Sequence, residues 1–96
     1  MYMVIRRYTG ASELADALVQ RQQEVKDLIS GVPGFKAYHA LRTDWGDVAT
    51  MTICDDKTGT DESVRRAAIW VRSNLAKVEM RPPEIIEGET ILSFER

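Results

Sequence analysis

Gln22 is the clearest polar side chain to interrupt an apolar helical stripe in this sequence. Its helical phase lies between those of Leu18 and Val25, which places the amide toward the buried side of a helix. A polar group buried without a partner costs roughly 1–3 kcal/mol, so such a position suggests a ligand that the amide could bind. The alternative is structural, with the amide bonded to a neighbouring backbone carbonyl.

His39 alternates with Phe35 and Leu41 along a predicted strand, so we expect its imidazole under the helices. Imidazole exchanges protons at neutral pH, which suits a general base or a group that orients a phenolic substrate. A core histidine bonded to a backbone group is the structural alternative. A metal site is not expected, because the chain has no second histidine and no spaced Cys/His set. The opposite strand phase would move His39 to the other face of the sheet.

Trp70 and Asn74 lie four residues apart, on one side of a second predicted helix. An indole beside an amide can line an aromatic ligand pocket by stacking and hydrogen bonding. As the alternative, Trp70 packs at the rim against the first helix or a partner subunit. The candidate catalytic residues are therefore His39, Trp70 and Asn74. The candidate substrate-binding residues are Gln22, Phe35 and Met51.

Composition and charge exclude several classes of protein. The 96 residues carry 13 Lys and Arg against 15 Asp and Glu, with no basic run of the kind that binds nucleic acid. No apolar run reaches the roughly 18–20 residues of a membrane span, and no leader is expected before the first strand. The single Cys54 excludes a disulfide framework; we expect it to be a small core or interface residue in a cytoplasmic protein. Neither a GxSxG motif nor a glycine-rich phosphate loop is present.

The elements that must position these residues follow from periodicity. Alternation of apolar and polar residues predicts strands at residues 2–8, 35–43, 48–54 and 88–95. Helical spacing predicts one helix over residues 12–30 and another from Thr60 or Asp61 to about Val78. The order strand, helix, strand, strand, helix, strand predicts an α+β, ferredoxin-like βαββαβ fold, with two helices on one face of a four-stranded antiparallel sheet. We expect one domain that spans residues 1–96.

The strand residues divide between the two faces of this sheet. The more apolar set is predicted to lie under the helices: Phe35, Ala37, His39, Leu41, Ala49, Met51 and Ile53. The other face would hold a mixed set: Tyr38, Ala40, Val48, Thr50, Thr52 and Cys54. A second copy packed sheet on sheet would cover this mixed face, and a monomer with one wet face is the alternative. Arg6 and Arg7 point to opposite faces, so one of them could reach a pocket mouth, with surface ion pairs as the alternative.

Three stretches of the sequence resemble a known group. The strand that opens at Met1, GVPGF before the second strand and PPEIIEGETILSF after the second helix resemble the dimeric α+β-barrel superfamily. More narrowly, they resemble small stand-alone proteins similar to antibiotic-biosynthesis-monooxygenase-like (ABM-like) domains. This resemblance implies a homodimer whose sheets face each other, with a ligand pocket between sheet and helices in each subunit. The haem-degrading branch places an Asn on the first strand and a His on the second helix, whereas the only Asn here is Asn74 and the only His is His39.

Two functions follow from the residues and the resemblance together. The first is a monooxygenase that needs no cofactor and acts on a small aromatic compound, whose anion activates O₂ while the protein supplies positioning and electrostatics. In it, the substrate is held and deprotonated by Gln22, His39, Trp70 and Asn74. The second is a homodimeric module without catalytic activity, which binds a small molecule or stabilises a neighbouring complex.

Overall fold

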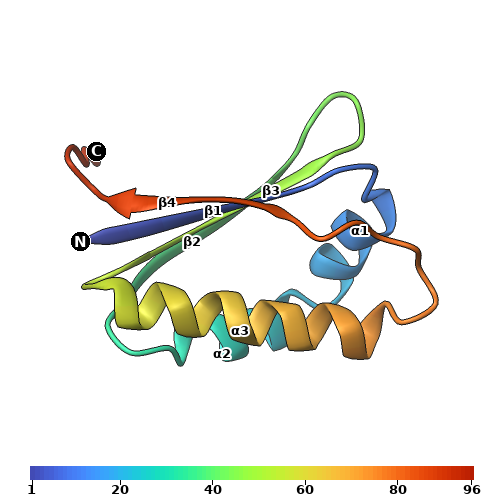
Figure 1. Cartoon of the computed structure of the whole chain (residues 1–96), viewed down its shortest axis with the longest axis horizontal. Coiled ribbons are helices and arrows are strands. Elements are labelled where there is room, and N and C mark those ends of the chain that lie inside the picture. Colours follow the sequence, from blue (N-terminus) through green and yellow to red (C-terminus); the bar gives the residue numbers. More distant parts are fainter.

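The computed structural model describes residues 1–96 and shows a four-stranded antiparallel sheet with three helices on one face (Figure 1). The strands pair in the order β2-β3-β1-β4 and are β1 (Tyr2–Tyr8), β2 (Phe35–Arg42), β3 (Val48–Cys54) and β4 (Glu84–Glu89). The helices are α1 (Ser12–Gln20), α2 (Gln22–Ser30) and α3 (Lys57–Asn74). The predicted α+β, ferredoxin-like fold is confirmed. No helix combines the length and the apolar composition that crossing a membrane requires.

The helix predicted over residues 12–30 is in fact two helices. Arg21 departs from helical geometry, with φ −115° and ψ 30°, and separates α1 from α2. The run from Gln20 to Glu24 is entirely polar, so it has no apolar side chain to hold a straight helix against the sheet. Because of the break, α1 packs on β2 and β3 while α2 packs on β2 and α3.

Helix α3 begins before the predicted start at Thr60 or Asp61. Asp56 caps it, because its carboxylate accepts a hydrogen bond from the Thr58 amide at 3.0 Å. Gly59 follows in the first turn, where the backbone comes very close to the neighbouring loop. A Cβ at this position would lie 2.1 Å from the Pro33 carbonyl oxygen. The helix ends at Asn74, short of the predicted end near Val78.

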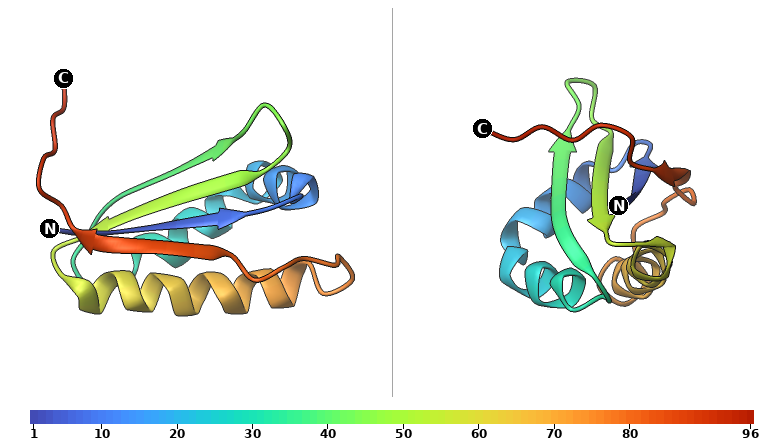
Figure 2. Two further views of the ribbon diagram at one scale, coloured as in Figure 1. Left: turned by 45° about the horizontal axis from the view of Figure 1, so that its top comes forward. Right: turned by 90° about the vertical axis from the view of Figure 1, so that its left-hand side faces the viewer.

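The last strand also differs from the prediction of residues 88–95. β4 pairs with β1 from Glu84 opposite Arg7 to Glu89 opposite Tyr2, and β1 begins there, so nothing remains for later residues to pair with. The Thr90 amide donates to the Met1 carbonyl at 2.9 Å, and the chain then leaves the sheet as a tail (Figure 2). Phe94 on this tail is 88% exposed.

The sheet has a covered face, against the helices, and a bare face, and their assignment is the reverse of the predicted one except at Phe35, which lies under the helices as predicted. On β3, Val48, Thr50, Thr52 and Cys54 are buried, whereas Met51 and its alternate neighbours are only half-buried. An irregularity between Phe35 and Ala37 changes the phase of β2, so Phe35 pairs with Cys54 and Tyr38 with Thr52 on the covered face. The bare face therefore carries Met3, Ile5, Ala37, His39, Leu41, Ala49, Met51, Ile53 and Ile86.

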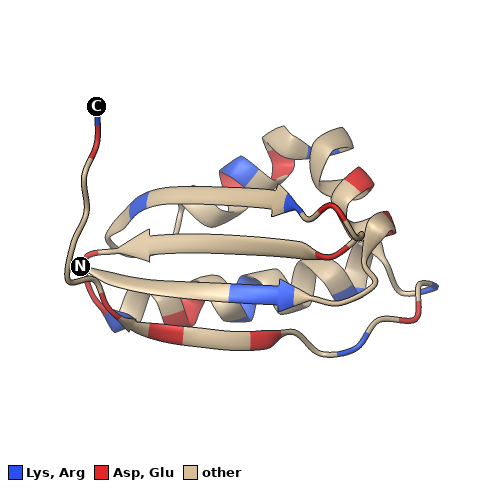
Figure 3. Cartoon of the chain, turned by 90° about the horizontal axis from the view of Figure 1, so that it is seen from above, with Lys and Arg blue, Asp and Glu red and all other residues tan.

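The two faces also differ in what surrounds them. The bare face has no helix over it, and the central parts of β2 and β3 are free of charged residues (Figure 3). Under the covered face, a hydrophobic core joins the sheet to all three helices: Tyr8, Ala11, Leu14, Ala15, Val25, Ile29, Val48 and Trp70. Cys54 is fully buried next to this layer, as expected for a small core residue.

Candidate functional site

A groove of about 530 Å³ runs along the outer edge of β2, between that strand and the end of α1 with α2. We call it the β2 groove. Its walls are mostly apolar, with aliphatic side chains from the helices and aromatic ones from β2: Leu18, Val19, Val25, Ile29, Phe35 and Tyr38. A mostly apolar concavity of this size, with a few polar groups, is typical of small-molecule sites.

Three of the predicted site residues line the β2 groove: Gln22, Phe35 and His39. Gln22 is exposed at the start of α2 and donates from Nε2 to the Val19 carbonyl at 3.3 Å, which is the structural alternative described above. His39 is exposed and lies on the bare face, opposite Met51, because of the reversed strand phase. The prediction that its imidazole lies under the helices is therefore wrong, although the edge position of β2 still brings it to the groove.

The other three predicted residues lie elsewhere. Met51 is on the bare face of β3. Trp70 is 7% exposed, so it is a core residue and not a rim residue, and its Nε1 donates to Glu24 at 2.8 Å. Asn74 donates to the Trp70 carbonyl at 2.8 Å and accepts from Arg21, the residue at the break between α1 and α2. Trp70 and Asn74 thus join α3 to the first two helices.

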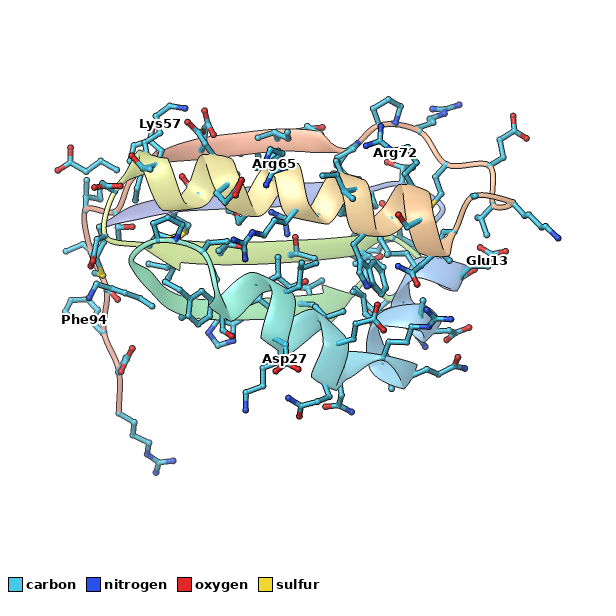
Figure 4. All side chains as sticks on the ribbon, turned by 90° about the horizontal axis from the view of Figure 1, so that it is seen from below. Glu13, Asp27, Lys57, Arg65, Arg72 and Phe94 are labelled. Atoms are coloured by element: carbon cyan, nitrogen blue, oxygen red, sulfur yellow. The ribbon has the colours of Figure 1, made fainter.

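A second, smaller cavity lies behind the β2 groove, between the covered face and the helices. This inner cavity measures about 20 Å³ and shares Leu18, Val25, Ile29 and Tyr38 with the groove. A cavity of that size has room for about one water molecule. Helices α2 and α3 lie side by side over this part of the sheet, with the Asp27 side chain pointing outward (Figure 4).

Arg6 lines the inner cavity and is only 2% exposed. Its Nη1 donates to Ser63 Oγ at a long 3.5 Å, its charge lies close enough to the Tyr38 hydroxyl to act on the pKa of that group, and its Nε–H has no partner. Thr50, beside it on β3, has a buried hydroxyl that is likewise unpaired. The alternation of β1, which groups Arg6 with Val4 and Tyr8, was the signal in the sequence that could have identified this arginine as a core residue.

The environment of the inner cavity changes the acidity of Tyr38. Burial raises the pKa of the Tyr38 hydroxyl above its ordinary value of 10.0, while the Arg6 guanidinium acts in the opposite direction. Cys54 also has a raised pKa, first because it is buried and second because of the Asp55 and Asp56 carboxylates. A thiol that resists ionisation is a poor nucleophile, which favours a packing role for Cys54.

No group of three or more His, Cys, Asp or Glu residues in this structure could hold a metal ion. A haem group ligated by histidine also does not fit the residues present, because α3 carries no histidine and His39 lies on β2. The polar groups that line the groove belong to Gln22, Lys26, Ser30, Tyr38 and His39, and the Arg6 guanidinium is buried behind it.

No protein-family model matches this chain, and a comparison with curated protein sequences gives no match. Solved structures do share its fold. A proposed antibiotic biosynthesis monooxygenase from Nitrosomonas europaea gives a TM-score of 0.72 at 13% identity, over 96% of this chain and 100% of that one. A variant of SnoaB, a cofactor-independent oxygenase from Streptomyces nogalater, gives 0.66 at 12% identity, over 99% and 97%.

The heme-degrader MhuD from Mycobacterium tuberculosis, with two hemes in its active site, gives a TM-score of 0.69 at 16% identity, over 99% of this chain and 100% of that one. At these identities the similarity shows the fold alone. The resemblance to ABM-like proteins is therefore confirmed as a shared fold. Because a cofactor-independent oxygenase and a heme-degrader share this fold, the chemistry must be argued from the site.

Proposed function

We propose that this protein binds a small aromatic compound in the β2 groove and oxidises it with O₂ as a cofactor-independent monooxygenase. The observation that carries the proposal is the groove itself. Its volume of about 530 Å³ exceeds the ~300 Å³ lower bound for ligand clefts. The Phe35 and Tyr38 rings lie in its wall, where they offer flat apolar surfaces to an aromatic guest.

His39 is the residue of the candidate catalytic set that supports proton transfer in this groove. Its imidazole can remove a proton from a phenolic or quinol-type substrate at neutral pH. The resulting substrate anion is electron-rich and transfers an electron to O₂, and the two radicals combine to form a C–O bond in a hydroperoxide. Loss of water from the hydroperoxide leaves one oxygen atom on the oxidised ring, so the substrate supplies all the electrons and no metal or organic cofactor is needed. The protein then contributes proximity and a fixed orientation of the substrate.

The proposal includes a homodimer formed through the bare face. Two features support it: the face is largely apolar, with Leu41 57% and Ile86 56% exposed, and it has no helix over it. Ala37 and His39 belong both to the bare face and to the lining of the groove. A second copy on the bare face would therefore border the groove and shield the imidazole from bulk water.

Oxygen uptake with 1,4-dihydroxynaphthalene, corrected for its spontaneous oxidation, tests the activity. We expect uptake that depends on protein concentration and falls by at least about tenfold in His39→Ala, since general bases contribute roughly 10²–10⁴-fold. Trp45→Phe, at an exposed position on the β2–β3 hairpin, serves as a folded control that keeps the activity. Uptake no faster than the spontaneous reaction across a series of such quinols would end the oxygenase proposal.

A binding module without catalytic activity is the second candidate, and the positions of Trp70 and Asn74 favour it. Their polar atoms are bonded to Glu24, Arg21 and the backbone, so His39 alone of the candidate catalytic set faces the groove. This function predicts that 1-naphthol binds in the β2 groove, as measured by titration calorimetry, without any oxygen uptake. A Phe35→Ala variant should then weaken binding.

A further inference from the structure

Arg6 is a buried cation without an anionic partner. A guanidinium remains charged at any pH at which the protein is folded, so burial does not neutralise it. None of the ion pairs in the structure includes Arg6, and the groups beside its guanidinium, on Ser63 and Tyr38, are uncharged hydroxyls. Buried charges are normally paired or bound to a ligand, which makes this position unusual for a purely structural residue.

Two of the four buried side-chain atoms that lack hydrogen-bond partners belong to residues that line the inner cavity. The Nε–H of Arg6 and the hydroxyl of Thr50 are buried and unpaired, and both residues line the inner cavity. Thr50 lies directly opposite Arg6 in the β1–β3 register. Together they present two hydrogen-bond donors, one of them on a cation, to a space about as large as one oxygen atom with its hydrogens.

The acceptors near Arg6 do not pair with its free Nε–H. Ser63 Oγ donates its own proton to the Thr60 carbonyl at 2.7 Å and meets Arg6 only at 3.5 Å. Glu24, on α2, is bonded to the indole of Trp70 and forms no ion pair with Arg6. An anion that enters from the groove would therefore meet two free donors and no competing carboxylate.

We propose that Arg6 and Thr50 form a subsite for an anionic oxygen or another single-atom anion at the inner end of the β2 groove. Since Tyr38 forms part of both walls, an aromatic body in the groove can direct an ionised hydroxyl past it into the inner cavity. The groove thereby selects acidic phenols and enols in their anionic form. This inference rests on the proposed aromatic site for its organic ligand, and a free halide is the other source of the same charge.

The test uses 4-nitrophenol, which ionises near neutral pH and whose anion absorbs visible light. We expect the wild-type protein to bind the anion at least tenfold more tightly than the neutral phenol, so that the absorbance titration of the bound compound shifts to lower pH. This shift measures the preference of the site for the anion, which we expect to arise at Arg6. Arg6→Met should lose it, and Arg72→Met, which removes an exposed cation on the outside of α3, should not (Figure 4).

Thermal unfolding gives a second readout that does not need the aromatic ligand. Sodium chloride should raise the melting temperature of the wild type relative to sodium gluconate at equal ionic strength, with no such difference in Arg6→Met. In gluconate, Arg6→Met should melt at or above the wild-type temperature, because an unpaired buried charge has been removed; a structural arginine would give the opposite result.

The outcomes separate the two proposals. If 4-nitrophenol binds equally well in both forms and chloride has no specific effect, the anion subsite is wrong while the aromatic groove stands. If neither form binds but chloride stabilises only proteins with Arg6, the aromatic groove is wrong and the anion subsite holds a free halide. If Arg6→Met is folded and still prefers the anion, the proposed anion subsite at Arg6 is wrong.

Discussion

The covered face and the bare face of one sheet have opposite characters at their centres. On the covered face, Arg6, Thr50 and Thr52 are at most 3% exposed although all three are polar. On the bare face, the neighbouring residues of the same strands, Ile5 and Met51, are apolar and only half-buried. An antiparallel sheet with one wet face normally shows the reverse division, with apolar residues against the helices and polar residues toward water.

The polar covered face and the apolar bare face affect the stability of the protein in different ways. A polar core loses stability unless its groups find partners, and here Arg6, Thr50 and Thr52 each keep an unpaired atom. An apolar bare face gains stability when something covers it. The interior therefore keeps polar groups without partners, and the outer surface exposes apolar side chains, as the two proposals above require.

The largest effect is expected where a charge is placed on the bare face. Met51→Lys puts an ammonium group at the centre of the proposed sheet-to-sheet contact, where an unpaired buried charge costs several kcal/mol. Association should weaken by roughly 10²–10³-fold, since about 1.4 kcal/mol corresponds to tenfold. Sedimentation equilibrium should show the 10.9 kDa monomer for Met51→Lys and twice that mass for the wild type and Met51→Leu. If the wild type is a monomer, the bare face is not covered by a second copy and the homodimer proposal is wrong.

The second effect concerns how closely α3 covers the sheet. Gly59→Ala would place a methyl group 2.1 Å from the Pro33 carbonyl oxygen and 2.8 Å from the Cys54 side chain, so the helix start must move away from the sheet. We expect the free energy of unfolding to fall by about 2–3 kcal/mol, as in other overpacked cores. Gly88→Ala, where a Cβ has open space, is the matched control for chemical denaturation. Equal stability of the two variants would show that the close approach at Gly59 is not required.

The sequence predicted the element order and the sheet, because turn residues and periodicity are local signals. It did not predict the break at Arg21, since no Gly or Pro interrupts residues 12–30. The end of β4 also depends on a partner: Glu89 is the last residue that has β1 beside it. In both cases the boundary of a helix or strand depends on an element that is distant in the sequence, which a local pattern cannot show.

The strand phase was mispredicted for a physical reason that also hid the inner cavity. Assigning the more apolar set to the helices assumes that the core takes the apolar side, but the polar residues Arg6, Thr50 and Thr52 are the buried ones. The irregularity after Phe35 broke the period of two that linked it to His39. Of the candidate site residues, Gln22, Phe35 and His39 line one groove, whereas Trp70 is a core residue whose indole donates to Glu24.

A smaller effect tests whether the polar character of the covered face is structurally useful. Thr52 is fully buried and its hydroxyl has no partner, so Thr52→Val should raise the free energy of unfolding by about 1 kcal/mol. Thr60→Val is the matched control, because that buried hydroxyl donates to the Lys57 carbonyl at 3.2 Å and its loss should destabilise. Urea denaturation of both variants measures the difference. A destabilised Thr52→Val would mean that this hydroxyl has a partner that the structure does not show.

The smallest effect comes from Asp47, at the end of the sheet where β3 begins and neither face is involved. Its carboxylate accepts hydrogen bonds from the Gly10 amide at 2.9 Å, from Trp45 at 2.9 Å and from Arg7 at 3.2 Å. These bonds, the one from Gly10 first, hold the pKa of Asp47 below its ordinary value of 3.8. The unfolded chain therefore takes up the proton more readily than the folded one, so this contribution to stability is complete above about pH 4 and is lost as the pH falls below that value.

Asp47→Asn should consequently remove part of the acid dependence of unfolding. The melting temperature of the wild type should fall more steeply between about pH 4 and pH 2 than that of the variant, and the variant should be the less stable of the two at pH 7. Because Asp47 belongs to neither the inner cavity nor the bare-face centre, the variant should keep both 4-nitrophenolate binding and the wild-type mass. A change in either of those properties would show that the two faces are coupled through the end of the sheet, and their opposite characters could then no longer be treated as independent features.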